Sequence, residues 1–162
     1  MCGGVDLIYV TCGMHTHGFE RLVRAMDEIA EKTREKVVIQ RGSTAYLPRF
    51  SRFSDFYPRD DAESLIKGAR VVVSHAGIGT IIQALNFERP LILVPRLKKF
   101  QEHNNDHQLE VAREVAKIYG VPTVLDVSDI KNLLEKVKPI KRKTKGKEKI
   151  IKCIKEFLAE AD

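Results

Sequence analysis

The chain has 162 residues, of which 43% are hydrophobic and 31% charged, a size and composition typical of one compact domain with a sheet and covering helices. No apolar stretch reaches the roughly 18 residues of a membrane span, and the first residues lack the basic flank and long apolar core of a secretory signal, so we expect a cytoplasmic protein. The formal net charge of +6 matches the excess in residues 138–149, which hold seven basic residues and one acid; a folded nucleic-acid platform would carry its charge on the body, so we expect no nucleic-acid partner.

The order of apolar patterns along the chain predicts an α/β fold. Short runs rich in β-branched residues alternate with segments whose apolar residues recur every three to four positions, which is typical of a Rossmann-like parallel sheet with helices on both faces. The predicted strands are residues 5–11, 36–40, a short one near Phe53, 70–74, 91–94 and 123–126. The predicted helices are residues 19–30, one capped by Asp60 or Asp61 and ended by Gly68, 78–85, 109–119, one capped by Ser128, and 150–158.

The sequence offers no pattern for a bound metal. Its three cysteines, Cys2, Cys12 and Cys153, are far apart and form no zinc motif, so free thiols are expected. No D-x-D motif occurs in the chain, a spacing at which paired aspartates can hold a divalent metal. We therefore expect neither a metal nor a cofactor.

A glycine-containing turn follows the strand predicted at 70–74 and opens a helix. Gly77 and Gly79 would let the backbone come close to a ligand, and the free amides and positive dipole end of the helix favour an anion such as a diphosphate. Two glycines alone indicate an ordinary tight turn about equally well, so the flanking residues have to decide.

Three separated motifs resemble one known family. SHAGIGT at 74–80, RPLILVPR at 89–96 and EHNNDHQLEVA at 102–112 stand in the order found in glycosyltransferase family 28 C-terminal domains, and VTCG at 10–13 fits the same pattern. The likeness runs from the first strand to the helix near Tyr119 and is strongest to the single-domain branch. It implies the C-terminal half of a GT-B glycosyltransferase and a UDP-sugar substrate, with UDP-N-acetylglucosamine as the expected donor.

The resemblance also implies which residues contact the donor. For the diphosphate these are Ser74, His75, Ala76, Gly77, Gly79 and Thr80. For the ribose and sugar they are Gln83, Asn105, Asp106, His107 and Gln108. Gly13 and Met14 are added to the diphosphate site because their turn after the first strand faces the same edge of the sheet, where open α/β folds bind ligands. Gln83 stands where more distant members have an acid, and its amide bonds a hydroxyl pair more weakly than a carboxylate. No general base is evident, and His75 and His15 are the candidates for proton transfer.

Each of these roles has a plainer alternative. Without its context His75 is better explained as a packed histidine, and His15 and His17 are equally compatible with turn residues that have no ligand. Asn105 or Asp106 is suited to cap the following helix. A non-catalytic nucleotide-sugar-binding or regulatory module remains open, whereas a dehydrogenase is disfavoured because no G-x-G-x-x-G follows the first strand.

The sequence divides into a body and a basic end. Residues 1–138 are predicted to form the nucleotide-sugar-binding domain, and residues 139–162 a basic linker and an amphipathic helix. A GT-B cleft lies between two such domains, so we expect a membrane-anchored, acceptor-binding partner subunit to complete it. The acceptor is then expected to be lipid-linked, with the chain held at the cytosolic face of the membrane.

Overall fold

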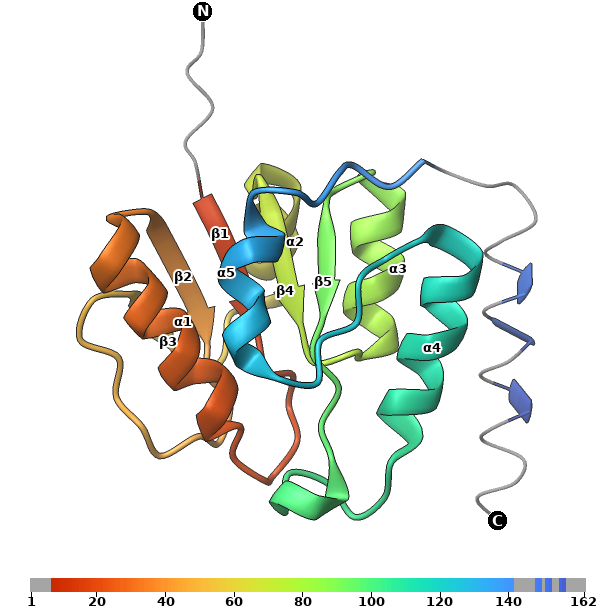
Figure 1. Cartoon of the computed structure of the whole chain (residues 1–162), viewed down its shortest axis with the longest axis horizontal. Helices are drawn as coiled ribbons and strands as arrows, with labels where there is room; N and C mark the ends of the chain where they lie inside the picture. Colours follow the sequence, from red (N-terminus) through yellow and green to blue (C-terminus); the bar gives the residue numbers. More distant parts are fainter. Residues whose placement is uncertain (1–6, 142–147, 150, 153–154, 157–162) are drawn as a thin grey trace, which may run out of the picture.

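A parallel sheet forms the centre of the molecule. The computed structural model describes residues 7–141, 148–149, 151–152 and 155–156, so the helix predicted at 150–158 lies largely outside the described residues. Five strands stand in the order β3-β2-β1-β4-β5, all parallel (Figure 1). Their bounds are Leu7–Thr11 (β1), Lys36–Gln40 (β2), Arg52–Ser54 (β3), Val71–Ser74 (β4) and Leu91–Leu93 (β5).

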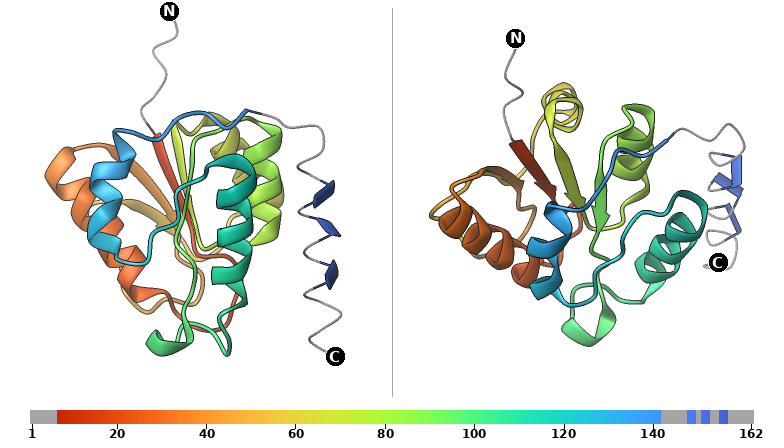
Figure 2. Two further views of the ribbon diagram at one scale, coloured as in Figure 1. Left: turned by 45° about the vertical axis from the view of Figure 1, so that its right-hand side comes forward. Right: turned by 45° about the horizontal axis from the view of Figure 1, so that its top comes forward.

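Helices cover both faces of this sheet, as the sequence predicts (Figure 2). The α-helices are α1 (Glu20–Thr33), α2 (Arg59–Gly68), α3 (Ile78–Asn86), α4 (His107–Tyr119) and α5 (Ile130–Leu134), with short 3-10 turns η1 (Lys98–Phe100) and η2 (Val127–Asp129). α1 and α5 share one core cluster with the sheet, and α2, α3 and α4 share the other. The predicted Rossmann-like α/β architecture is confirmed.

Alternation along the strands supplies both cores. In β1 the side chains of Leu7 and Tyr9 enter the cluster beneath α2, α3 and α4, while Ile8 and Val10 enter the cluster beneath α1. A central parallel strand is buried on both faces, which explains its unbroken apolar sequence. Ile140 is buried in the cluster beneath α2, α3 and α4, so residues packed on the domain continue at least two positions beyond residue 138.

The prediction of a strand at residues 123–126 is wrong. Thr123 forms only an isolated parallel bridge with Leu93, because β5 is three residues long and offers little further backbone to pair. The chain then leaves the sheet, and the Asp126 carboxylate accepts a hydrogen bond from the backbone N–H of Ser128.

Two predicted helix caps are also wrong. Asp126, and not Ser128, caps the turn that leads into α5. α2 begins two residues earlier than a cap at Asp60 would allow, with Pro58 in the capping position and both acids in its first turn, where their charges complement the helix dipole.

Two further properties of the described residues concern membrane spans and cysteine thiols. No helix among them is long and apolar enough to cross a bilayer. Cys12 is a free thiol, and burial raises its pKa to about 12, so it is unreactive at neutral pH. Cys2 and Cys153 lie outside the described residues.

Candidate functional site

The carboxyl ends of the strands form one edge where the connections diverge. From β1 the chain continues to β2 and β3 on one side, and β4 and β5 lie on the other. Open α/β sheets bind ligands in the crevice at such a point, just beyond the strand ends. The register places Thr11 beside both Gln40 and Ser74, so the turns that follow β1, β2 and β4 meet at this edge.

The start of α3 has unoccupied hydrogen-bonding capacity at this edge. Gly77 is its N-cap and makes no side-chain cap bond, and the first turn contains no acid that would neutralise the dipole. Gly79 is exposed, and a Cβ added to it would meet no atom within 4 Å. The amides at Gly79 and Thr80 thus have the arrangement that binds anions at helix N-termini.

His75 lies between the two glycine turns. A Cβ added to Gly77 would fall 2.1 Å from its Nε2 atom, and one added to Gly13 would fall 2.4 Å from the same atom. This corrects the interpretation of Gly77: the absence of its side chain makes room for the imidazole, whereas only Gly79 leaves open space. Gly13 also has a φ of 72°, a left-handed conformation that favours glycine.

The protonation of His75 follows from its contacts. Nδ1 lies 3.1 Å from the backbone oxygen of Thr11 and must donate to it, so Nε2 carries the lone pair that faces the turns. Burial, followed by the nearby Arg96 guanidinium, lowers the pKa of His75 to about 4 despite that hydrogen bond. The ring is therefore neutral at pH 7 and presents an acceptor to the ligand edge.

The remaining residues predicted at the diphosphate differ in accessibility. The side chains of Ser74 and Ala76 are buried, so only their backbone groups are available to a ligand. The Ser74 hydroxyl has no hydrogen-bond partner among the described residues. Met14, by contrast, is 82% exposed at the tip of the β1–α1 turn.

The loop before α4 arranges the residues predicted at the sugar. The Gln108 amide oxygen accepts the backbone N–H of Arg96 at 3.0 Å, which leaves its NH₂ group as a donor. Asn105 accepts the backbone N–H of His107, the first residue of α4, and Asp106 accepts that of Lys98. The side chain of Asn105 therefore bonds the first N–H group of α4, as the capping alternative predicts, whereas the side chain of Asp106 makes no bond to this helix.

Two predicted sugar-contact residues lie on helices that border the same crevice. Gln83 is half-buried on α3. The side chain of His107 is 44% exposed at the start of α4 and lies 3.5 Å from Glu110.

A fully buried arginine joins the loops after β1 and β5. Arg96 has no exposed surface, and its guanidinium donates to the backbone oxygens of Cys12 (2.7 Å), His17 (2.9 Å), Gly18 (3.0 Å) and Glu102 (3.2 Å). Since its own N–H also fixes Gln108, one residue sets the spacing between the two turns of the crevice. The sequence analysis did not identify this residue.

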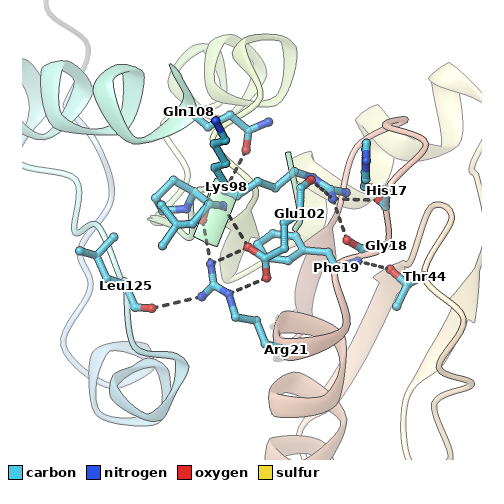
Figure 3. Close-up of polar contacts among 12 residues, drawn as sticks. His17, Gly18, Phe19, Arg21, Thr44, Lys98, Glu102, Gln108 and Leu125 are labelled. Atoms are coloured by element: carbon cyan, nitrogen blue, oxygen red, sulfur yellow. Dashed lines mark hydrogen bonds and ion pairs between the residues drawn. The ribbon is translucent and has the colours of Figure 1, made fainter. Parts of the chain in front are cut away.

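An ion pair between Arg21 and Glu102 supports this arginine from the side of α1 (Figure 3). The Glu102 carboxylate is bonded by Arg21 through Nε at 2.6 Å and also accepts the backbone N–H of Leu97. Arg21 further donates to the backbone oxygens of Pro95 and Leu125. The loop after β5 is therefore fastened to α1 through Arg21 and Glu102.

Three histidines stack beside the crevice. The His15 ring lies 4.8 Å from that of His17 and 4.6 Å from that of His103, measured between centroids. Burial and the neighbouring charges of the cluster and of Arg96 lower the pKa of both His15 and His103. No group of three potential ligands suited to a metal ion occurs among the described residues. His103 is a member that the sequence analysis missed.

A cavity of about 550 Å³ opens next to these loops, on the side of the β1–α1 turn. Its lining includes Gly18, Arg21, Ser43, Phe100 and Glu102. None of the predicted diphosphate-contact residues lines it, so it is a space separate from the start of α3.

Comparison with known proteins identifies relatives among sugar transferases. The profile of the glycosyltransferase family 28 C-terminal domain matches residues 7–161. A UDP-N-acetylglucosamine transferase subunit ALG13 from Debaryomyces hansenii is 41% identical over 73 residues, which is 45% of this chain and 32% of that protein. The human protein of the same name is 30% identical over 121 residues, 68% of this chain and 10% of that protein.

A third relative matches a larger share of this chain than the two ALG13 proteins do. The UDP-N-acetylglucosamine--N-acetylmuramyl-(pentapeptide) pyrophosphoryl-undecaprenol N-acetylglucosamine transferase of Pseudothermotoga lettingae is 32% identical over 143 residues. The match covers 85% of this chain and 40% of that enzyme. The chain thus spans less than half the length of each of these relatives.

Solved structures share the fold at low sequence identity. The calicheamicin glycosyltransferase CalG4 superposes with a TM-score of 0.63 at 18% identity, over 82% of this chain and 34% of that one. MurG of Acinetobacter baumannii gives 0.56 at 15% identity, over 84% and 42%. The fold is accordingly that of one half of a GT-B enzyme.

Proposed function

The chain belongs to the glycosyltransferase family 28 C-terminal domains, and we propose that it binds UDP-N-acetylglucosamine and, with a membrane-anchored partner, transfers the sugar to a lipid-linked acceptor. The observation that carries this proposal is the open start of α3, where Gly79 leaves room for a diphosphate beside free amides. These amides and the helix dipole would stabilise the leaving diphosphate without a metal.

The donor follows from the relatives and from the polar groups opposite α3. UDP-N-acetylglucosamine appears in the names of all three curated relatives. The NH₂ group of Gln108 is free to donate to a sugar hydroxyl, because its oxygen is held by Arg96. We assign Gln83 to the ribose, and Asn105, Asp106 and His107 to the remaining rim of the donor site.

The proton acceptor is proposed to lie in the partner. A pKa of about 4 makes His75 a weak base at neutral pH, although its Nε2 can still accept a hydrogen bond or take up a proton when a diphosphate arrives. The pKa of His15 is also lowered, so its imidazole is likewise a weaker base than that of a free histidine. His75 and His15 are therefore proposed to act on bound phosphate and not as the general base.

A partner is supported by the architecture and by the names of two relatives. The chain contributes one Rossmann-like unit, whereas a GT-B active site lies between two. The two ALG13 proteins are each named as a transferase subunit. The exposed Met14 at the ligand edge is suited to such an interface.

Gly79→Ala tests the diphosphate site. We expect the new methyl group to weaken UDP binding, measured by calorimetry, by about tenfold or more, which corresponds to about 1.4 kcal/mol. The fold should tolerate the change, because nothing lies within 4 Å of the added atom and alanine favours a helix by up to about 1 kcal/mol. Gly68→Ala, equally open at the end of α2, is the matched control and should leave the affinity unchanged.

Two outcomes would contradict the proposal. Equal UDP affinity in Gly79→Ala and the parent chain would remove the start of α3 from the site. UDP binding without sugar transfer, even after co-expression with a membrane-anchored partner and assay with radiolabelled donor, would favour the non-catalytic module.

A further inference from the structure

A buried carboxylate fastens the loop between β2 and β3 to α1. Asp27 is 1% exposed, and its two oxygens accept the backbone N–H groups of Arg49 (2.8 Å), Phe50 (2.9 Å) and Ser51 (2.9 Å) and the hydroxyl of Tyr46 (2.8 Å). Burial by itself would raise the pKa of Asp27, yet these hydrogen bonds lower it. The carboxylate is therefore charged, and it holds this loop in one conformation.

Large apolar side chains are exposed on the fastened loop, on β3 and just after β3. Leu47, Phe50, Phe53 and Phe56, here called the outer rim, are 59%, 53%, 39% and 48% exposed. Four such residues within ten positions is unusual for a surface, where exposed apolar side chains are ordinarily scattered. Asp27 fixes the backbone of the loop at Phe50, so at least this part of the rim is held in place before any partner binds.

The rim also carries positive charge. Arg49 and Arg52 are exposed between its apolar side chains, and residues 47–54 contain no acid. The nearest following acid, Asp55, is paired with Arg41 at 2.7 Å, and the Arg41 guanidinium lies over the Phe53 ring. No acid of the described residues pairs with either rim arginine, so their charge is available to an external partner.

We propose that the outer rim docks on the surface of a bilayer that contains acidic phospholipids. Aromatic side chains are suited to the level of the headgroups, where arginines reach lipid phosphates while their stems stay in apolar surroundings. The choice of a bilayer rests on the proposed lipid-linked acceptor, but the docking itself is measured without sugar transfer.

The position of the rim agrees with this orientation. It lies on the side of the sheet away from α4 (Figure 1). The loop that carries it starts at the ligand edge, where Gly42 passes so close to the β1–α1 turn that an added Cβ would be 3.0 Å from the backbone oxygen of Gly13. A docked rim would therefore hold the ligand edge near the headgroups.

Tryptophan fluorescence tests the docking, because the chain contains no tryptophan. Phe50→Trp and Phe53→Trp in the full chain each provide one probe, to be titrated with vesicles of phosphatidylcholine alone or mixed with phosphatidylglycerol. We expect a blue shift, and quenching by brominated lipid, only with the acidic vesicles. Leu125→Trp, at an exposed position away from the rim, should show neither.

Charge removal provides a second readout. Arg52→Gln should weaken binding to the acidic vesicles about fivefold, the loss expected for one basic residue near an anionic surface, while Arg113→Gln on exposed α4 should have no effect. Docking is refuted if the rim probes do not shift, or if Leu125→Trp shifts equally. If the fluorescence of the rim tryptophans is already blue-shifted without vesicles, and sedimentation equilibrium gives twice the mass of the chain, the rim is covered by a second copy of the chain and not by a bilayer.

Discussion

Replacing Arg96 by lysine is the sharpest perturbation of the ligand edge. The guanidinium donates to four backbone oxygens on both sides of the crevice, whereas a lysine ammonium is a single point that reaches one side only. At least one buried oxygen would lose its partner, at about 1–3 kcal/mol. We therefore expect Arg96→Lys to lower the free energy of unfolding by about 2 kcal/mol in urea titrations.

The same variant should weaken UDP binding by about tenfold or more, because the turn at Gly13 and the amide of Gln108 are no longer held at a fixed spacing. Arg70→Lys is the matched control. Arg70 pairs with Glu35 and donates to the backbone oxygen of Leu134, remote from the ligand edge. It should lose stability and keep its UDP affinity. Unchanged affinity in a folded but less stable Arg96→Lys would refute the positioning role.

Three further predictions concern the fold around the site. Gly77→Ala should lower the free energy of unfolding, measured by thermal denaturation, by about 1–3 kcal/mol, because its Cβ would fall 2.1 Å from His75 Nε2. Gly79→Ala should not have this effect, because its Cβ would meet no atom within 4 Å. The pKa of His75 is lower in the native chain (about 4) than in the unfolded chain (about 6.5), so the unfolded chain takes up a proton first as the pH falls. The contribution of His75 to the free energy of unfolding is therefore complete above pH 6.5 and is lost as the pH falls to 4. Urea titrations should show a loss of up to about 3 kcal/mol over this range, and the loss should be smaller in His75→Gln. Asp27→Asn should cost about 2 kcal/mol, since its NH₂ group would face backbone donors, and limited proteolysis should then cut the loop near Phe50 faster.

The sheet was predictable because its signal is local. A parallel strand buried on both faces needs a continuous apolar run, so Lys36–Gln40 is predicted with its observed bounds and the buried strands differ by a residue or two. The prediction failed at Thr123, where pairing depends on how much of β5 remains to pair with. That length is a property of the neighbouring strand and not of residues 123–126.

The site was predictable only in part for the same reason. Glycines and polar residues next to strand ends indicate a ligand edge, and they are where the sequence analysis expected them. The contacts of Arg96 span 6 to 84 residues along the chain and end on main-chain oxygens, which no spacing rule detects. The local indication was an arginine three residues after a buried strand, in a position where charged side chains are rare unless they are paired.

The contacts of Arg96 also bear on how such a chain diversifies. Its guanidinium recognises only carbonyl groups of Cys12, His17, Gly18 and Glu102, and every amino acid supplies that group. A substitution at the partly exposed position 17 can therefore alter the surface beside the ligand edge while its carbonyl group still bonds Arg96, whereas Cys12 is buried in the core. Selection for new substrates would act on such exposed side chains, while Arg96 itself would resist replacement.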